Sequence, residues 1–474
     1  MSREAVIIII AAVYLVIVSA VGMASVRYSK TTSAFMVAKG ALAPGVVGFL
    51  LMSEFVGTGT FLGLPQQAYT SGMFASMAVI SVAIGFFFYA FIMAPKYNES
   101  GEITISGIMQ SRYGKGARLA ASLIMIVALL IDTVSNYTGG AVALGSVLHV
   151  SVKPASFVLA ALVSVIVAMG GLRGIGLSNI VHIIVKYAAL AVVAGEAFLL
   201  LRGNSTAQAR IPHELYTVQG TGAMALVTYT VANVGAVFAT QYVLQSIGSL
   251  KDRKQSLRAS LIASAALVPA GLLGAYIGVA ARGLFPHINS VDVVPQVMDQ
   301  LSPAWAGFVT AGIIAAAMVS LCALVIGATT LFIKDFYRPR KAGDKPEREL
   351  RATRIAAVVL GLLPLPFAWF VPHILDVVFF SRALRASLGV MAVFAFYLPN
   401  ASRGRGVVAG LLCSLVATCT WYALGDPFGV DNTYIAAGIP IVAMLIDCVV
   451  IRLRGRRNAP AGLSLSDQST EVPS

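Results

Sequence analysis

Residues 41–64, ALAPGVVGFLLMSEFVGTGTFLGL, form an apolar stretch long enough to cross a membrane, and Gly57-Thr58-Gly59 interrupts it. A second apolar stretch, residues 219–247, carries a similar interruption at Asn233-Val234-Gly235. A helix that breaks inside a membrane exposes backbone carbonyl and amide groups, which can bind a cation or a carboxylate. Two helices broken at matching positions predict a binding site at mid-depth. Taken singly, either glycine pattern could instead serve close helix packing.

The chain contains thirteen apolar segments, most of them long enough to span a hydrocarbon core of ~30 Å. They lie at residues 5–23, 41–64, 71–95, 119–149, 154–171, 174–201, 219–247, 259–281, 303–333, 353–372, 373–398, 406–424 and 432–451. The chain is 58% hydrophobic and 11% charged, which excludes a soluble multidomain protein. We therefore expect an all-α, multi-pass membrane protein.

The basic residues alternate between the two sides of the membrane. Of 34 Lys and Arg residues, 26 fall in the odd-numbered loops and the C-terminal segment, and five in the N-terminus and the even-numbered loops. The positive-inside rule therefore places the N-terminus outside and the C-terminus in the cytoplasm. This topology also explains the net charge of +14, so we expect membrane lipids but no nucleic acid as partners. No obligate protein partner is evident.

The segments after the first one form two sets of five. Because five is odd, the second set has the opposite orientation, as an inverted repeat requires. The expected parts are a first helix and linker (1–40), two five-helix repeats (41–202 and 203–402), two further helices (403–457) and a disordered tail (458–474).

Four patches resemble the sodium:solute symporter family. They are Phe61-Leu62-Gly63-Leu64-Pro65 with Ala68-Tyr69 and Gly72, Gly170-Gly171-Leu172-Arg173-Gly174, Gln241-Tyr242-Val243-Leu244-Gln245 with Lys251-Asp252, and Ala315-Ala316-Ala317-Met318-Val319-Ser320 running to Lys334-Asp335-Phe336-Tyr337. They occur in the expected order and on the expected sides of the membrane. The resemblance implies a LeuT-like five-plus-five inverted repeat within about 13 transmembrane helices, one before the repeats and two after them. It also implies secondary active transport by alternating access.

In this family a sodium ion lies between the first and eighth repeat helices. The resemblance implies as its ligands here the carbonyl oxygens of Ser53, Val56 and Ala316 and the hydroxyl of Ser320. The chain departs from the family pattern in two places, because Val319 replaces a second hydroxyl and Ser178-Asn179 replaces a Thr-Asp pair. One oxygen ligand and one negative charge are therefore missing, which puts sodium coupling in question.

Three basic residues lie inside spans: Lys186, Arg382 and Arg385. Lys186 lies two turns beyond Asn179 on the same helix face. Its ammonium group could stand in for sodium, or it could form a salt bridge with Glu54 or Asp132. Glu54, just before the first break, could restore the missing charge, carry a proton, contact the substrate or have a structural role.

Arg382 and Arg385 share a helix face at i, i+3 spacing near mid-depth. Because a charge at the bilayer centre costs ~2.5–3.5 kcal/mol, each needs a partner. Two guanidinium groups suit a carboxylate substrate, and pairing with Asp376 or with a carboxylate on another helix is the alternative. The residues expected to line the substrate site are Gly57, Gly59, Thr60, Asp132, Asn136, Asn233, Arg382 and Arg385.

The sequence contains no Walker loop, no metal-ligand spacing and no nucleophile beside a base, so we expect neither an enzyme nor a cofactor beyond a coupling ion. The prediction is a cell-membrane symporter that couples sodium to a small organic solute, with a carboxylate favoured. A proton-coupled or sodium-independent carrier is the alternative, and a non-transporting sensor is a further one. Uptake unaffected by sodium or pH gradients would favour an uncoupled carrier.

Overall fold

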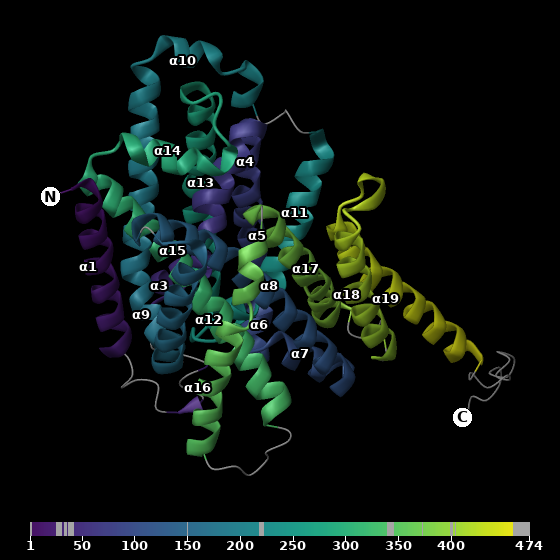
Figure 1. Cartoon of the computed structure of the whole chain (residues 1–474). Helices are drawn as coiled ribbons and strands as arrows, with labels where there is room; N and C mark the ends of the chain where they lie inside the picture. The colour runs from purple at the N-terminus through teal and green to yellow at the C-terminus, as the bar shows by residue number, and fades with distance from the viewer. Residues whose placement is uncertain are drawn as a thin grey trace, which may run out of the picture.

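The computed structural model describes residues 2–24, 31–32, 36, 42–148, 150–217, 222–338, 346–371, 373–398, 402 and 404–457. These residues are almost entirely helical and contain no β-strand. Most of the helices form one bundle, and α18 (Arg405–Ala423) and α19 (Asn432–Arg457) lie at one edge of it (Figure 1). Most of the expected linker after the first helix, and all of the expected disordered tail, lie outside the described residues.

The first half of the chain begins with α1 (Arg3–Ala24). The segment expected to form the first repeat contains α3 (Pro44–Ser53), the π-helix η2 (Gly59–Gly63), α4 (Leu64–Ser71), η3 (Gly72–Ser76), α5 (Met77–Ile92), α6 (Ala94–Ser100), α7 (Ile105–Tyr113), α8 (Lys115–Leu148) and α9 (Val152–Arg202).

The segment expected to form the second repeat contains α10 (Ser205–Arg210), η4 (His213–Tyr216), α11 (Gly222–Ala239), α12 (Gln241–Ile247), α13 (Arg253–Leu284), η5 (Ser290–Asp292), α14 (Val293–Gln300), α15 (Pro303–Phe332), η6 (Ile333–Tyr337), α16 (Pro346–Leu362), η7 (Leu365–Phe370) and α17 (Ile374–Tyr397). The short η8 (Pro427–Gly429) joins α18 to α19. Among the described residues nine helices are long and apolar enough to cross a membrane, and the bent pair α11–α12 makes ten. The count of thirteen therefore stays a prediction.

Helix α9 covers two of the expected spans, and its contacts show that it folds back on itself. A Cβ atom at Gly140 of α8 would contact both Leu159 of α9 and Ala317 of α15, and one at Gly312 of α15 would contact Ala189 of α9. In a straight helix Leu159 and Ala189 would be about 45 Å apart. Because they meet neighbouring turns of α15, the chain reverses between them, as two separate spans require.

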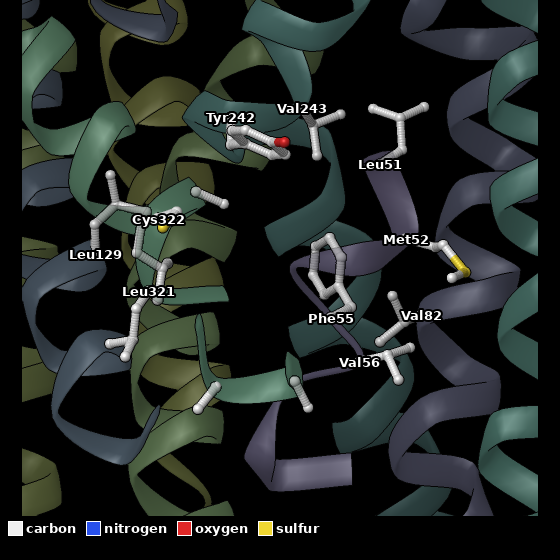
Figure 2. Packing of buried hydrophobic residues seen from close by; sticks show 14 of the residues in the cluster. Leu51, Met52, Phe55, Val56, Val82, Leu129, Tyr242, Val243, Leu321 and Cys322 are labelled. Atoms are coloured by element: carbon white, nitrogen blue, oxygen red, sulfur yellow. The ribbon is translucent and has the colours of Figure 1, made fainter. Parts of the chain in front are cut away.

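The first break lies where the sequence predicts it. The helix α3 ends at Ser53, and helical structure resumes only at Gly59. A Cβ atom at Gly57 would lie 2.5 Å from Asn136 Oδ1 and 2.6 Å from Ser320 Oγ, so glycine is needed for the close approach to α8 and α15. Buried apolar side chains from α3, α5, α8, α12 and α15 surround this break (Figure 2).

The second break lies five residues beyond the predicted position. The helix α11 runs unbroken through Asn233-Val234-Gly235, and the chain bends by 49° at Thr240, between α11 and α12. A Cβ atom at Gly235 would lie 2.7 Å from the Cβ of Ala386, so this glycine lets α11 and α17 pack closely. The prediction of a break at Asn233-Val234-Gly235 is therefore wrong, and the packing alternative holds there.

We expect Gly389→Ala to destabilise the protein by about 1–3 kcal/mol, because overpacking has this cost. A Cβ atom at Gly389 would lie 2.2 Å from the carbonyl oxygen of Gly235, which is backbone and cannot turn aside. The matched control is Gly195→Ala on α9, where a Cβ atom meets nothing within 4 Å. Thermal unfolding in detergent should separate the two variants, and equal midpoints would contradict this account of the α11–α17 contact.

Candidate functional site

A cavity of about 20 Å³ lies beside the first break. It is lined by Glu54, Phe55, Gly57, Gly59, Thr60, Ala78, Val79, Asp132, Asn136, Leu375, Val378 and Arg382. These residues come from both of the expected repeats and include six of the eight positions expected to line a substrate site. The other two, Asn233 and Arg385, contact the lining through hydrogen bonds. A cavity of this size holds about one water molecule, so the site is closed in this conformation.

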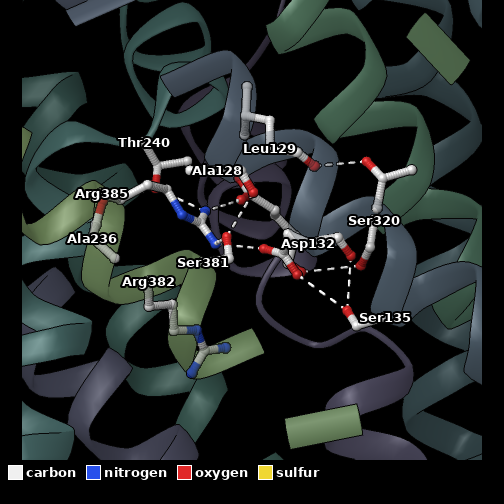
Figure 3. A network of polar contacts seen from close by, with 12 residues as sticks. Ala128, Leu129, Asp132, Ser135, Ala236, Thr240, Ser320, Ser381, Arg382 and Arg385 are labelled. Carbon is white, nitrogen blue, oxygen red and sulfur yellow. Dashed lines mark hydrogen bonds and ion pairs between the residues drawn. The ribbon is translucent and has the colours of Figure 1, made fainter. Parts of the chain in front are cut away.

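Arg385 is completely buried and joins two carboxylates. Its Nη1 donates to Glu54 Oε1 at 2.8 Å, and its Nη2 donates to Asp132 Oδ2. The same guanidinium donates to the hydroxyls of Thr240 and Ser381 at 3.2 and 3.1 Å (Figure 3). Arg385 therefore links α17 to the first break, to α8 and to the second break. For Arg385 the alternative prediction, pairing with a carboxylate outside its own helix, is confirmed.

Arg382 lies one helical turn away and has different partners. Its Nη1 donates to Asn233 Oδ1 at 2.8 Å and to the carbonyl oxygen of Ala78 at 3.3 Å. The rings of Phe55 and Phe379 lie 5.6 and 5.4 Å from its guanidinium carbon. Within the described ranges no carboxylate lies within 4.0 Å of Arg382, and its Nε has no hydrogen-bond partner. The cavity wall therefore contains a buried guanidinium that forms no ion pair with a carboxylate of the described residues.

The Lys186 side chain reaches the C-terminal end of α3. Its Nζ donates to Ser53 Oγ at 2.7 Å and to the carbonyl oxygens of Ser53 and Val56, each at 3.2 Å. Neither predicted salt bridge forms, because the carboxylates of Glu54 and Asp132 both pair with Arg385. Ser53 and Val56 are two of the residues expected to bind sodium, so the ammonium group lies on part of that ligand set.

The two remaining expected ion ligands, Ser320 and Ala316, both lie on α15, and Ser320 contacts the first break. Ser320 Oγ donates to the carbonyl oxygen of Glu54 at 3.0 Å, and Ala316 is buried on α15. Asn179 Oδ1 accepts a hydrogen bond from Ser53 Oγ at 2.6 Å. The Ser53 hydroxyl thus accepts from Lys186 and donates to Asn179, which orients both groups.

The sequence reasoning missed Thr240 and Ser381, which both contact Arg385. Thr240 immediately precedes the family-like patch that begins at Gln241, and this position was the available signal for the second break. Nothing in the sequence marks Ser381 apart from its position next to Arg382.

Arg385→Gln should destabilise the protein by about 3–5 kcal/mol, because it leaves the carboxylates of Glu54 and Asp132 buried without their partner. Adding Glu54→Gln and Asp132→Asn should recover most of the loss, since no charge then remains unpaired. Arg382→Gln is the matched control and should cost less, because it leaves no carboxylate unpaired. Thermal unfolding in detergent measures all three, and equal losses for Arg382→Gln and Arg385→Gln would contradict the assigned pairing.

Known proteins resemble this chain over nearly its whole length. The sodium/proline symporter of Staphylococcus aureus is 22% identical over 482 residues, which cover 95% of this chain and 93% of that protein. A structure of a Na⁺-coupled sialic acid symporter in a substrate-bound outward-open state aligns with a TM-score of 0.79 at 18% identity, over 94% of this chain and 98% of that one. A nucleobase-cation-symport-1 family transporter in a closed conformation aligns with a TM-score of 0.60 at 15% identity, over 89% of this chain and 95% of that one.

These structural matches show a common fold, the LeuT-like fold that the sequence predicts. The sequence model of the sodium:solute symporter family matches residues 35–413. The chain therefore belongs to the sodium:solute symporter family and is a multi-pass secondary transporter.

Proposed function

We propose that this transporter carries a small organic acid by alternating access, with the carboxylate of the solute bound by Arg382 in the cavity between the two repeats. The observation that carries the proposal is a buried guanidinium that lines the cavity without a carboxylate partner among the described residues. An arginine keeps its proton when it is buried, and the hydrogen-bond partners of Arg382 among the described residues are neutral oxygens, so its charge favours binding of an anion. A solute carboxylate provides that anion and can accept two parallel hydrogen bonds from the guanidinium.

The charge balance of the interior supports an anionic solute. The buried Asp, Glu, Lys and Arg residues around the breaks are two carboxylates, Glu54 and Asp132, and three cations, Lys186, Arg382 and Arg385. With all five ionised, this part of the interior carries one net positive charge. A bound carboxylate would neutralise it, whereas a cationic solute would add to it at a large cost in free energy.

The cavity also offers an acceptor for a donor group on the solute. Among the described residues Glu54 Oε2 is buried without a hydrogen-bond partner, and Glu54 and Arg382 line the same cavity. We therefore favour a small acid that also carries an amino or hydroxyl group. Two relatives are named for proline and sialic acid, both of which are acids of this kind. Because the closed cavity holds only about one water, the breaks must move apart to admit such a solute.

Sodium is the coupling ion that the family name implies, and we retain sodium-coupled symport as the mode of transport for the carrier as a whole. The residues of the first break, with Asn136, Asn233 and Thr60, complete the proposed solute site. Uptake that persists without sodium and follows a pH gradient would favour the proton-coupled alternative.

We expect Arg382→Gln to weaken uptake of the acid tenfold to a hundredfold, because a hydrogen bond to a charged group contributes about 1.5–3 kcal/mol. Arg382→Lys should recover only part of the lost uptake, since an ammonium group cannot donate two parallel hydrogen bonds to a carboxylate as the planar guanidinium of arginine does. Arg405→Gln, at an exposed helix end, is the control and should have no effect.

An uptake measurement needs a transported solute. To identify one, the thermal stability of the purified protein is measured with a panel of amino, hydroxy and plain carboxylic acids, and with the amide of each acid. Uptake of the stabilising acid into proteoliposomes then compares the variants. Preference for the amides, or undiminished uptake by Arg382→Gln, would overturn the proposal.

We also propose that the protein lies in the cell membrane with its N-terminus outside and its C-terminus in the cytoplasm. Basic residues from different odd-numbered loops meet on one face, which supports this orientation. Arg118 pairs with Asp335 and donates to the carbonyl oxygen of Lys334, and Lys334 pairs with Glu102. The positive-inside rule assigns such a face to the cytoplasm.

This orientation predicts the accessibility of single cysteines introduced after the native four are replaced. Phe428→Cys, between α18 and α19 at a position 94% exposed, should react with a membrane-impermeant maleimide on intact cells. Lys251→Cys, exposed before α13, should react only after the cells are permeabilised. The opposite pattern would reverse the topology.

A further inference from the structure

The C-terminal end of α3 is occupied by a cation that the chain itself supplies. The last carbonyl groups of a helix have no donor within the helix, and they lie at the negative end of its dipole. Here α3 ends at Ser53, and Lys186 Nζ lies 3.2 Å from the carbonyl oxygen of Ser53 and 3.2 Å from that of Val56, which lies within the break. The broken helix therefore creates a position that favours a positive charge.

The three hydrogen bonds of Lys186 match the three donors of an ammonium group. Two acceptors are carbonyl oxygens and the third is Ser53 Oγ at 2.7 Å, which is itself fixed by Asn179. Lys186 is fully buried, and no carboxylate of the described chain lies within 4.0 Å of it. Backbone and hydroxyl oxygens are thus what compensates this charge, as they would for a small metal cation.

The residues around this ammonium group do not fit a bound sodium ion. Sodium would need the carbonyl oxygens of Ser53 and Val56, and both accept from Lys186. A second positive charge beside the ammonium group would be repelled in a site from which water is excluded. The second hydroxyl that the family pattern places on α15 is also absent, since that position is Val319.

We propose that the Lys186 ammonium group takes the place of a sodium ion at Ser53 and Val56, and that sodium does not bind there in the native protein. Because Lys186 is covalently attached to α9, this cation cannot leave with the solute, so a sodium gradient cannot act through this position. Any sodium that drives transport binds elsewhere. The inference concerns the cation alone and does not depend on the identity of the solute.

The test uses the full-length protein in detergent and needs no solute. Thermal unfolding of the wild type, Ser320→Ala and Ser178→Ala is compared in sodium chloride and choline chloride, because Ser320→Ala removes the expected sodium ligand that is a side chain, whereas the carbonyl ligands survive any such substitution. Ser178 is the matched control, because it is a buried serine next to Asn179. The hydroxyl of Ser178 has no hydrogen-bond partner among the described residues. The proposal predicts that any sodium response of the wild type persists unchanged in both serine variants. A sodium response that Ser320→Ala abolishes and Ser178→Ala retains would overturn it.

Lys186→Ala gives a second and independent readout. Removing the ammonium group leaves buried carbonyl oxygens without a donor, so the unfolding midpoint should fall in choline chloride. Sodium should then restore part of the loss in this variant, because the position is free for a cation. Lys186→Arg keeps the charge and should show no such sodium response. Equal midpoints for the wild type and Lys186→Ala in both salts would also overturn the proposal.

Discussion

The interior of this protein is organised by the pairing of Arg385 with Glu54 and Asp132. An isolated charge in a membrane interior is costly, and pairing one guanidinium with two carboxylates offsets part of that cost for the three groups. The pairing also joins α17 to α8 and to both breaks. Since both carboxylates are committed to Arg385, Arg382 and Lys186 must find other partners, and this constraint sets the chemistry of the site.

The two remaining cations meet different oxygens. Arg382 lies in the cavity wall, where its partners are an amide and a carbonyl oxygen, so it can still bind an anion. Lys186 lies at the end of α3, where three oxygens complete its hydrogen bonds and leave no free donor. The first cation is available to a solute and the second is bound to the scaffold. A family site for a mobile ion has thus become, in our account, a contact within the chain.

The sequence alone predicts the broad architecture, because apolar segments and basic loops reflect the membrane directly. It also predicts the first break, where Gly57 is needed for the approach to Asn136 and Ser320. The sequence does not predict the position of the second break. Gly235 allows close packing against Ala386, and a glycine in the sequence does not distinguish close packing from a helix break. The pairing of the buried charges could not be predicted, since it depends on the rotation of α9 and α17 about their axes.

The position of Lys186 illustrates that limit. Helical spacing places it on the same face as Asn179 but does not show how far the flexible side chain extends. A map of the purified protein by electron cryomicroscopy in sodium chloride, at a resolution that separates side chains from ions, tests the central claim most directly. Our account predicts side-chain density for Lys186 that ends within hydrogen-bond distance of the carbonyl oxygens of Ser53 and Val56, with no separate peak between those oxygens. An isolated peak between those oxygens, with Lys186 turned away, would contradict it.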